Sequence, residues 1–203
     1  QEVHHRVKNN LQVISSILNL QSSFVNDEQT LEILAESQNR IKTMSYIHET
    51  LYQTSDFSSI DFTDYIKSLA ASLLQSYAPK DCEVEMISEF DKIFLDLDQA
   101  IPCGLIMNEL VSNAFKYAYK GRENGNLNIK VKQKDKQISL EVSDDGVGLP
   151  EGYDPSESES LGIYLVYALI EQLDAKIEVQ SFIEGNSQEQ SSGTRFLITF
   201  DVE

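Results

Sequence analysis

Two consecutive runs of apolar residues with helical spacing begin the chain, and they limit the possible folds more than any other feature. Residues that recur every three or four positions form one face of an α-helix. Two such helices joined by the polar turn at residues 26–28 form an antiparallel hairpin. A lone hairpin cannot bury both apolar faces, so we expect two copies of the chain to form a four-helix bundle, as a homodimer. The faces consist of Val7, Leu11, Ile14 and Leu18 in the first helix and Leu31, Leu34, Ile41, Met44, Ile47 and Leu51 in the second.

Two of the three histidines, His4 and His5, are adjacent in the first helix. Successive helical residues point about 100° apart, so His4 borders the apolar face and His5 points toward solvent. An exposed imidazole can act as a nucleophile, although adjacent surface histidines at a helix end need no function. We expect His48, late in the second helix, to be an ordinary helix-end residue. The same periodicity places Glu32, Glu36, Arg40 and Lys42 on the outward side of the second helix.

Composition excludes several classes of function. With 16 basic and 33 acidic residues the formal net charge is −17, whereas general affinity for nucleic acid or anionic membrane needs a basic surface. A polyanionic ligand must therefore be held locally, by helix N-termini, backbone amides or a metal ion.

The chain also lacks the marks of a membrane or secreted protein. We find no run of about eighteen consecutive apolar residues, as a membrane helix needs, and expect no signal peptide. Cys82 and Cys103 lack metal-ligand spacing, so we expect a reduced, cytoplasmic compartment. Because the chain begins at Gln1 without an initiator Met, we expect a fragment or a processed product.

A polar, helix-breaking stretch at residues 54–59 divides the 203-residue chain. We therefore expect a dimerisation hairpin at residues 1–58 and a second domain at residues 59–203. Asp61 has the position of an N-cap for the helix that follows. Helices and mostly antiparallel strands in the predicted order indicate an α+β fold, in which a two-layer α/β sandwich has several helices on one sheet face. The predicted helices span about residues 61–77, 99–119 and 161–173, and the strands 82–88, 92–97, 127–133, 137–142, 175–182 and 194–202.

The predicted helix at residues 99–119 carries three polar side chains with helical spacing. Glu109, Asn113 and Lys116 stand at i, i+4 and i+7, so all three project from one face. An amide oxygen suits Mg²⁺, which prefers oxygen ligands and bridges phosphates. An ammonium group can meet a phosphate as a point charge. The alternative is a solvated polar helix face.

The strand predicted at residues 137–142 is followed at once by Asp144, Gly146 and Gly148. An ionised carboxylate only accepts hydrogen bonds, so Asp144 can take one from the exocyclic amine of adenine. The glycines let backbone approach a flat ring closely. A turn with an acid at the strand end explains this pattern equally well.

A loop rich in Gly, Pro, Ser and Glu, at residues 150–160, precedes a helix that begins with Leu161 and Gly162. Free amides at a helix N-terminus bind phosphate without net positive charge, although glycine at a helix start is also common. The order of these features, closed by Gly193 and Thr194 at a strand start, favours a nucleotide site.

In this order the motifs resemble the Bergerat-type ATP-binding domain that histidine kinases share with heat-shock chaperones and type II topoisomerases. In this chain NELVSNAFKYAY resembles the N box of that family and DDGVGLP resembles its G1 box. SLGIYLVYALIEQL resembles the G2 box, and GTRF resembles the terminal strand motif. The N-terminal HHRVKNNLQVISSILNLQ closely resembles the phosphoacceptor box of the sensor histidine kinases that read HRVKN. Together the five motifs extend over nearly all of the chain.

The resemblance implies a histidine kinase core that binds ATP and Mg²⁺, phosphorylates its own histidine, and passes the phosphoryl group to an aspartate of a response-regulator receiver domain. It implies that His5, directly before Arg6, is the phosphoacceptor in preference to His4, and that residues 150–160 are the ATP lid. For the ATP site it implies Asn113 as the magnesium ligand and Glu109 as a further metal or water-orienting group. The other implied residues are Lys116 and Tyr117 as nucleotide contacts, Asp144 with Gly146, Gly148 and Thr194 around adenine, and Leu161, Gly162 and Ile163 as phosphate-binding amides.

The chain departs from the commoner histidine kinases at the base. Those proteins have an acidic residue after the histidine, where this chain has Arg6. Glu2 lies three residues before His5, and helical geometry lets it accept a proton from the imidazole, so we predict Glu2 as the base.

Two other functions fit the same motifs. One is a Bergerat-fold protein serine kinase of the anti-sigma type, which a phosphoryl linkage labile to acid and stable to base would exclude. The other is a non-catalytic, dimeric signalling scaffold that binds ATP. The intact His5, Glu109, Asn113, Lys116 and Asp144 argue against the scaffold.

Overall fold

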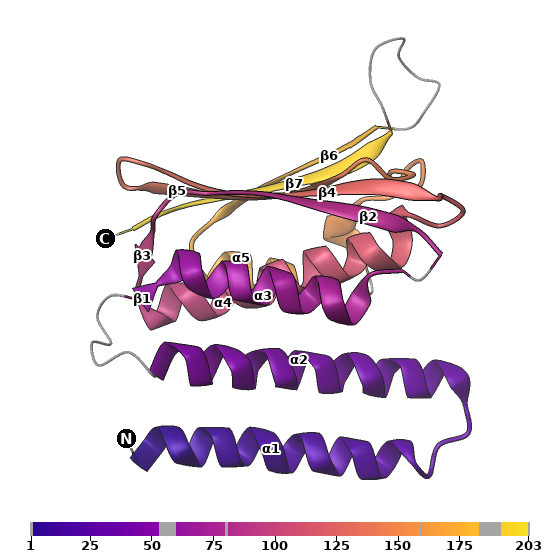
Figure 1. The fold of residues 1–203 in the computed structure, drawn as a ribbon, viewed down its shortest axis with the longest axis vertical. Helices are drawn as coiled ribbons and strands as arrows, with labels where there is room; N and C mark the ends of the chain where they lie inside the picture. Colours follow the sequence, from indigo (N-terminus) through magenta and orange to yellow (C-terminus); the bar gives the residue numbers. More distant parts are fainter. Residues whose placement is uncertain (1, 53–59, 80, 159, 183–191, 203) are drawn as a thin grey trace.

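A computed structural model describes residues 2–52, 60–79, 81–158, 160–182 and 192–202, except for the side chains of residues 2–6, 8, 28, 32 and 46–52. The elements stack in layers (Figure 1): the sheet, then α3, α4 and α5 on one of its faces, then α2, and α1 farthest from the sheet. The helices are α1 (Glu2–Ser22), α2 (Glu28–Tyr52), α3 (Phe62–Tyr77), α4 (Leu97–Asn113) and α5 (Leu161–Gln172), with a π-helical turn η1 (Ala114–Ala118) and a 3₁₀ turn η2 (Pro155–Glu157). The strands are β1 (Ile60–Asp61), β2 (Glu83–Phe90), β3 (Phe94–Leu95), β4 (Asn124–Lys134), β5 (Gln137–Asp144), β6 (Lys176–Phe182) and β7 (Gly193–Asp201).

The first two helices form the predicted antiparallel hairpin (Figure 1). Asp27 begins α2 by accepting a hydrogen bond from the Thr30 amide at 2.8 Å, which satisfies one of the free donors of that helix end. Among the described helices, none is long and apolar enough to cross a membrane. The hairpin does not stand apart, because α2 packs along α4 and α3 of the second domain.

The main sheet has five strands in the order β2-β4-β5-β7-β6. Only β2 and β4 are parallel, and the other three pairs are antiparallel, which agrees with the mostly antiparallel prediction. The strand predicted at residues 92–97 is wrong in extent: β3 has two residues and pairs with β1, apart from the main sheet. It ends early because Asp96 caps α4, accepting from the Gln99 amide at 2.9 Å.

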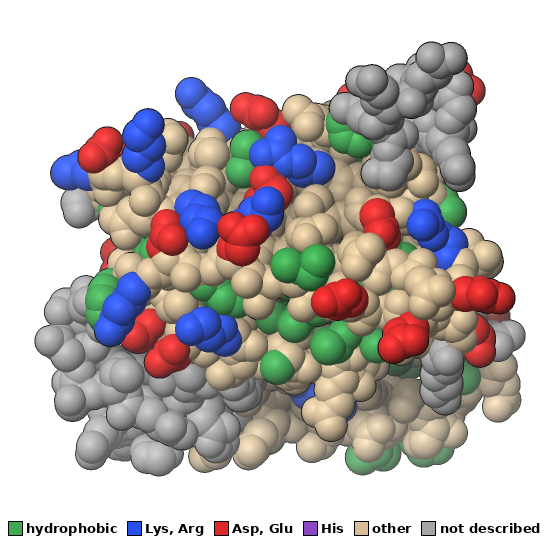
Figure 2. Space-filling model, turned by 45° about the horizontal axis from the view of Figure 1, so that its top comes forward, with side chains coloured by type: hydrophobic (Ala, Val, Ile, Leu, Met, Phe, Trp, Pro, Cys, Tyr) green, Lys and Arg blue, Asp and Glu red, His purple; other side chains and the backbone are tan. Residues whose placement is uncertain are grey.

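Alternation along the strands explains why the sheet is covered on one face. In β4 and β5, every second residue is buried, and these apolar side chains meet the helices. The other face is charged, and Figure 2 shows basic and acidic side chains intermixed over this side of the molecule. There Arg195 pairs with Glu141 at 2.6 Å, and Lys130 lies 3.8 Å from Glu89. The two-layer α/β sandwich predicted for the second domain is therefore confirmed.

Candidate functional site

A cavity of about 510 Å³ opens where α4, η1, α5, β5, β7 and α2 meet. It collects most of the side chains that the sequence motifs single out. One predicted glycine, Gly146, is not among its lining residues. The predicted residues that line it are Glu109, Asn113, Lys116, Tyr117, Asp144, Gly148, Leu161, Gly162, Ile163 and Thr194.

The end of α4 differs from the regular α-helix that the sequence predicts. Asn113 is its last residue, and the chain continues as the π-helical turn η1, which carries Lys116. A π turn changes the angular spacing of the residues that follow, and such turns are frequent at functional sites. Glu109, Asn113 and Lys116 nevertheless face the same cavity. The solvated-face alternative is wrong for Glu109, whose residue is 3% exposed.

Asp144 occupies the strand end on the opposite side of the cavity. Its Oδ1 accepts hydrogen bonds from the amides of Gly146, at 2.9 Å, and Thr194, at 3.2 Å. Burial raises the pKa of Asp144 above its ordinary value, and the two amide hydrogen bonds oppose that rise. With Oδ1 held by two amides, Oδ2 is the oxygen left to accept from a ligand.

The glycine of the G1 motif that is absent from the lining has a packing role. A Cβ on Gly146 would lie 2.4 Å from the carbonyl oxygen of Ala118, so only glycine lets η1 approach this turn. Gly148 has φ of +77°, a conformation that favours glycine. Gly148 thus lines the cavity, and Gly146 allows η1 to pack against the turn that contains it.

At the start of α5, Ser160 caps the helix by accepting from the Ile163 amide at 3.4 Å. A Cβ on Gly162 would lie 2.5 Å from Oε2 of Glu109 and 3.1 Å from Nη2 of Arg40. The first turn of α5 therefore lies directly against a pair of charged side chains, one of which comes from the hairpin.

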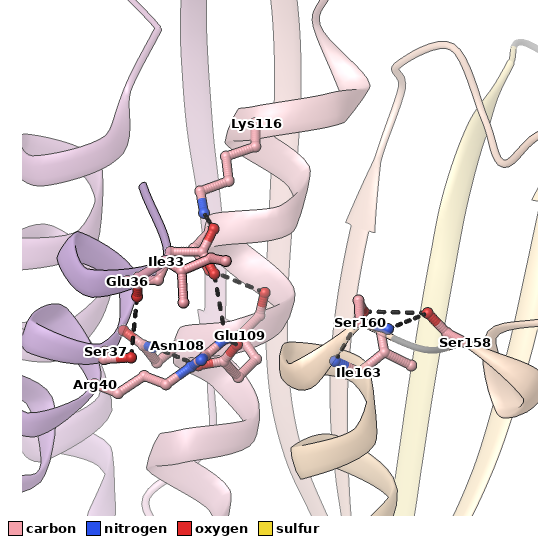
Figure 3. A network of polar contacts seen from close by, with 11 residues as sticks. Ile33, Glu36, Ser37, Arg40, Asn108, Glu109, Lys116, Ser158, Ser160 and Ile163 are labelled. Carbon is pink, nitrogen blue, oxygen red and sulfur yellow. Dashed lines mark hydrogen bonds and ion pairs between the residues drawn. The ribbon is translucent and has the colours of Figure 1, made fainter. Parts of the chain in front are cut away.

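Figure 3 shows that the hairpin itself contributes to the cavity. Arg40 donates from Nε and Nη2 to the two carboxylate oxygens of Glu109, at 2.7 and 2.8 Å. Lys116 pairs with Glu36, which precedes Arg40 by one helical turn on α2. Thr43 donates to the side-chain oxygen of Asn108 at 3.0 Å. We call these three pairs the α2–α4 docking contact.

The placement of Glu36 and Arg40 on the outward side of the second helix is therefore wrong. The Arg40 side chain is 12% exposed, and its hydrogen bond to Glu109 is the main cause that raises its pKa. The sequence does indicate that Glu36 and Arg40 lie close together, because they are opposite charges at i and i+4 of a helix. Such a pair usually lies on a solvated face, so the sequence alone does not disclose its partner helix.

The predicted phosphoacceptor region lies away from the cavity. Figure 1 shows α2 between α1 and the helices of the second domain. The side chains of His5, His4, Glu2 and His48 lie outside the described residues, so their roles stay predictions.

The predicted metal ligands meet different surroundings. Asn113 lines the cavity and is partly exposed, so its amide oxygen is open to a hydrated Mg²⁺. Glu109 is engaged by Arg40. Among the described residues, no cluster of three or more His, Cys, Asp or Glu forms a metal site. Of the two predicted ligands, Asn113 would be the one to hold Mg²⁺, because Glu109 is engaged by Arg40.

Comparison with known proteins shows similarity over both domains. Residues 2–77 match the histidine kinase family, and residues 98–203 match the family described as histidine kinase-, DNA gyrase B-, and HSP90-like ATPase. The chain is 29% identical over 188 residues to the sensor histidine kinase PdtaS of Mycolicibacterium smegmatis, covering 92% of this chain and 37% of that protein. It is 27% identical over 185 residues to blue-light-activated histidine kinase 2 of Erythrobacter litoralis, covering 88% of this chain and 52% of that protein.

A solved structure agrees with the fold. The histidine kinase domain of the blue-light-activated kinase from Erythrobacter litoralis superposes with a TM-score of 0.72 at 24% identity, over 98% of this chain and 89% of that one. The present chain spans about a third to a half of the length of the curated relatives that it matches.

Proposed function

This chain belongs to the histidine kinases, and we propose that it is a two-component kinase core that transfers the γ-phosphoryl group of ATP to His5 and then to an aspartate of a response regulator. The observation that carries the proposal is the single cavity lined by Asn113, Lys116, Asp144 and Gly162. These residues come from separate elements, and each is of the type that one part of a nucleotide requires.

In this proposal adenine lies at the Asp144 end of the cavity and the phosphates lie toward Lys116 and α5. The free Oδ2 of Asp144 accepts from the adenine amine, and Thr194 lies beside it at the start of β7. The first amides of α5 and the ammonium of Lys116 hold phosphate oxygens. Asn113 would hold Mg²⁺, which would supply neutralisation of phosphate charge.

The chemical step is a transfer between ATP and an imidazole. A ring nitrogen of His5 attacks the γ-phosphorus, a nitrogen–phosphorus bond forms, and the bond to the ADP oxygen breaks. The proton of the ring passes to a base, which we propose is Glu2. A neutral imidazole is a competent nucleophile near neutral pH because its ordinary pKa lies close by.

We further propose that the hairpin forms a homodimer and binds the receiver domain of the response regulator. The support is a second apolar stripe on α1 and the turn that follows it, at i, i+4, i+7 and i+11, that no part of the described chain covers. The stripe consists of Val13 (57% exposed), Ile17 (51%), Leu20 (63%) and Phe24 (80%).

The proposal is tested by incubating the chain with γ-labelled ATP and Mg²⁺. We expect a label that is labile to acid and stable to base in the wild type and in His4→Gln, and no label in His5→Gln. Glu2→Gln is expected to slow labelling without preventing ATP binding. A label that survives in His5→Gln and disappears in His4→Gln would move the phosphoacceptor to His4.

The other candidate functions give different results in the same assay. An acid-stable, base-labile label favours a serine kinase. ATP binding with no label in any variant favours a scaffold.

A further inference from the structure

Two charged groups that the sequence motifs place at the phosphates and their metal are already paired with α2. Lys116 is paired with Glu36, and Glu109 is paired with Nε and Nη2 of Arg40. Glu36 and Arg40 also line the cavity themselves. The hairpin therefore reaches the phosphate end of the proposed nucleotide site within one chain.

The position of these pairs matters as much as their charge. Oε2 of Glu109 and Nη2 of Arg40 are the atoms that a Cβ on Gly162 would meet first, at the first turn of α5. A carboxylate here lies at the positive end of the α5 dipole, the place where a helix N-terminus favours an anion. The Glu109 carboxylate thus lies against the first turn of α5, where the proposed function places phosphate oxygens, with Arg40 as its counter-ion.

We propose that the α2–α4 docking contact and the phosphates of the nucleotide compete for Lys116 and for the start of α5, so that Glu36 and Arg40 form an autoinhibitory contact. The inference rests on the proposed function, because it concerns regulation of the same site. Glu36 is the direct competitor, since its carboxylate holds the ammonium that a phosphate requires. Arg40 is the anchor that keeps Glu109 against Gly162.

Physical arguments support an exchange of partners. The Lys116 ammonium is a point charge, and a phosphate that approaches it meets the carboxylate of Glu36 at the same time. The buried Glu109 cannot lose Arg40 without another partner, because an unpaired buried carboxylate is costly. Water that reaches Glu109 when α2 moves away from α4 would supply that partner. Binding free energies are reciprocal, so a nucleotide that weakens docking is itself weakened by docking.

The size of the effect follows from exposure. The Lys116 and Glu36 side chains are 25% and 29% exposed, so their pairing is partly screened by water. A closed contact of this strength lowers the apparent affinity for a competing ligand by about two- to five-fold. A ligand without phosphates, such as adenosine, does not compete for Lys116 and should not respond.

The test compares MgATP and adenosine by titration calorimetry in the wild type, Glu36→Gln and a matched control. The control is Glu171→Gln, which removes an exposed carboxylate in the last turn of α5, away from the cavity. We expect Glu36→Gln to bind MgATP about two- to five-fold more tightly and adenosine unchanged, and Glu171→Gln to match the wild type for both ligands. Equal or weaker MgATP binding by Glu36→Gln overturns the inference.

Arg40→Lys is a second variant, which tests the inhibitory contact independently of Glu36→Gln. Arg40→Lys keeps the charge beside Glu109 but loses the two-pronged geometry that only arginine offers. We expect it too to bind MgATP more tightly and adenosine unchanged, and a loss of MgATP affinity in this variant contradicts an inhibitory role for Arg40. Wild type that binds neither ligand refutes the proposed function and this inference with it, whereas MgATP binding that neither variant tightens refutes the inference alone.

Discussion

Replacing Arg40 with methionine is expected to lower the free energy of unfolding by about 3 kcal/mol, because it leaves a buried carboxylate without its counter-ion. Glu109 is 3% exposed and accepts from Arg40 at 2.7 and 2.8 Å. After the substitution, the described donor that remains to the Glu109 carboxylate is the side-chain amide nitrogen of Asn108, at 3.1 Å. Methionine keeps an apolar stem of similar length, so lost packing contributes little.

The loss has an upper limit that the structure itself sets. If α2 separates from α4, water reaches Glu109, so the destabilisation cannot exceed the free energy of docking by much. A loss of about 3 kcal/mol, at the low end of the range for broken buried pairs, corresponds to a fall in Tm of roughly 6–12 °C for a chain of this size. Urea denaturation followed by far-ultraviolet circular dichroism measures it.

Two further variants decide whether the unpaired charge is the cause. Lys67→Met removes an exposed base of α3 whose ion pair with Asp64 is 3.9 Å long, and we expect almost no change in stability. The double variant Arg40→Met/Glu109→Met removes both charges, and we expect it to recover most of the stability that Arg40→Met loses. A double variant as unstable as the sum of its single variants would refute the reasoning.

Four other predictions follow from single residues. Asp144→Asn is expected to weaken adenosine binding by about a hundred-fold in calorimetry, because Oδ1 stays with the two amides and the new NH₂ faces the adenine amine. Since burial raises the folded-state pKa of Asp144, wild-type stability should fall as pH rises from the unfolded-state pKa through the folded-state pKa, and Asp144→Asn should flatten that part of the profile. Gly146→Ala is expected to cost about 1–3 kcal/mol in urea denaturation through its 2.4 Å clash with Ala118, more than Gly152→Ala, where the space is open and only the positive φ is strained. Ile17→Asp is expected to halve the mass measured by light scattering without unfolding the chain, and an unchanged dimer mass would exclude the α1 stripe as the interface.

Features whose physical cause lies within a few residues could be predicted from the sequence. Asp61 caps α3 as expected, accepting from the Asp64 amide, because an N-cap needs only its own first turn. Asp144 ends its strand, and Gly162 lies in the first turn of its helix, for equally local reasons. The order of these local features predicts the α+β fold, and its resemblance to the Bergerat-type ATP-binding domain implies the ten predicted residues that line one cavity.

Features that depend on a partner far along the chain could not be predicted. Arg40 and Glu109 are 69 residues apart, and nothing near Arg40 distinguishes a base that faces solvent from one that faces another helix. The parallel pairing of β2 with β4 depends on the path of α4 between them. Lys116 lies in the π turn that follows α4, where it pairs with Glu36 of α2. The spacing of residues in a regular α-helix predicts neither the π turn nor this partner.

The acidity of the chain explains why partner exchange suits this site. With a net charge of −17, the protein offers a polyanion little general attraction, so binding depends on the few cationic groups at the cavity. Its basic lining side chains are Arg40, Lys116 and Lys120, and its acidic ones are Glu36, Glu109 and Asp144. In the docked arrangement two of the three bases are neutralised by two of the three acids, and a triphosphate can use Lys116 only by displacing Glu36. The contact that holds α2 against the second domain therefore also sets the nucleotide affinity, and any partner that pulls α2 away should raise that affinity.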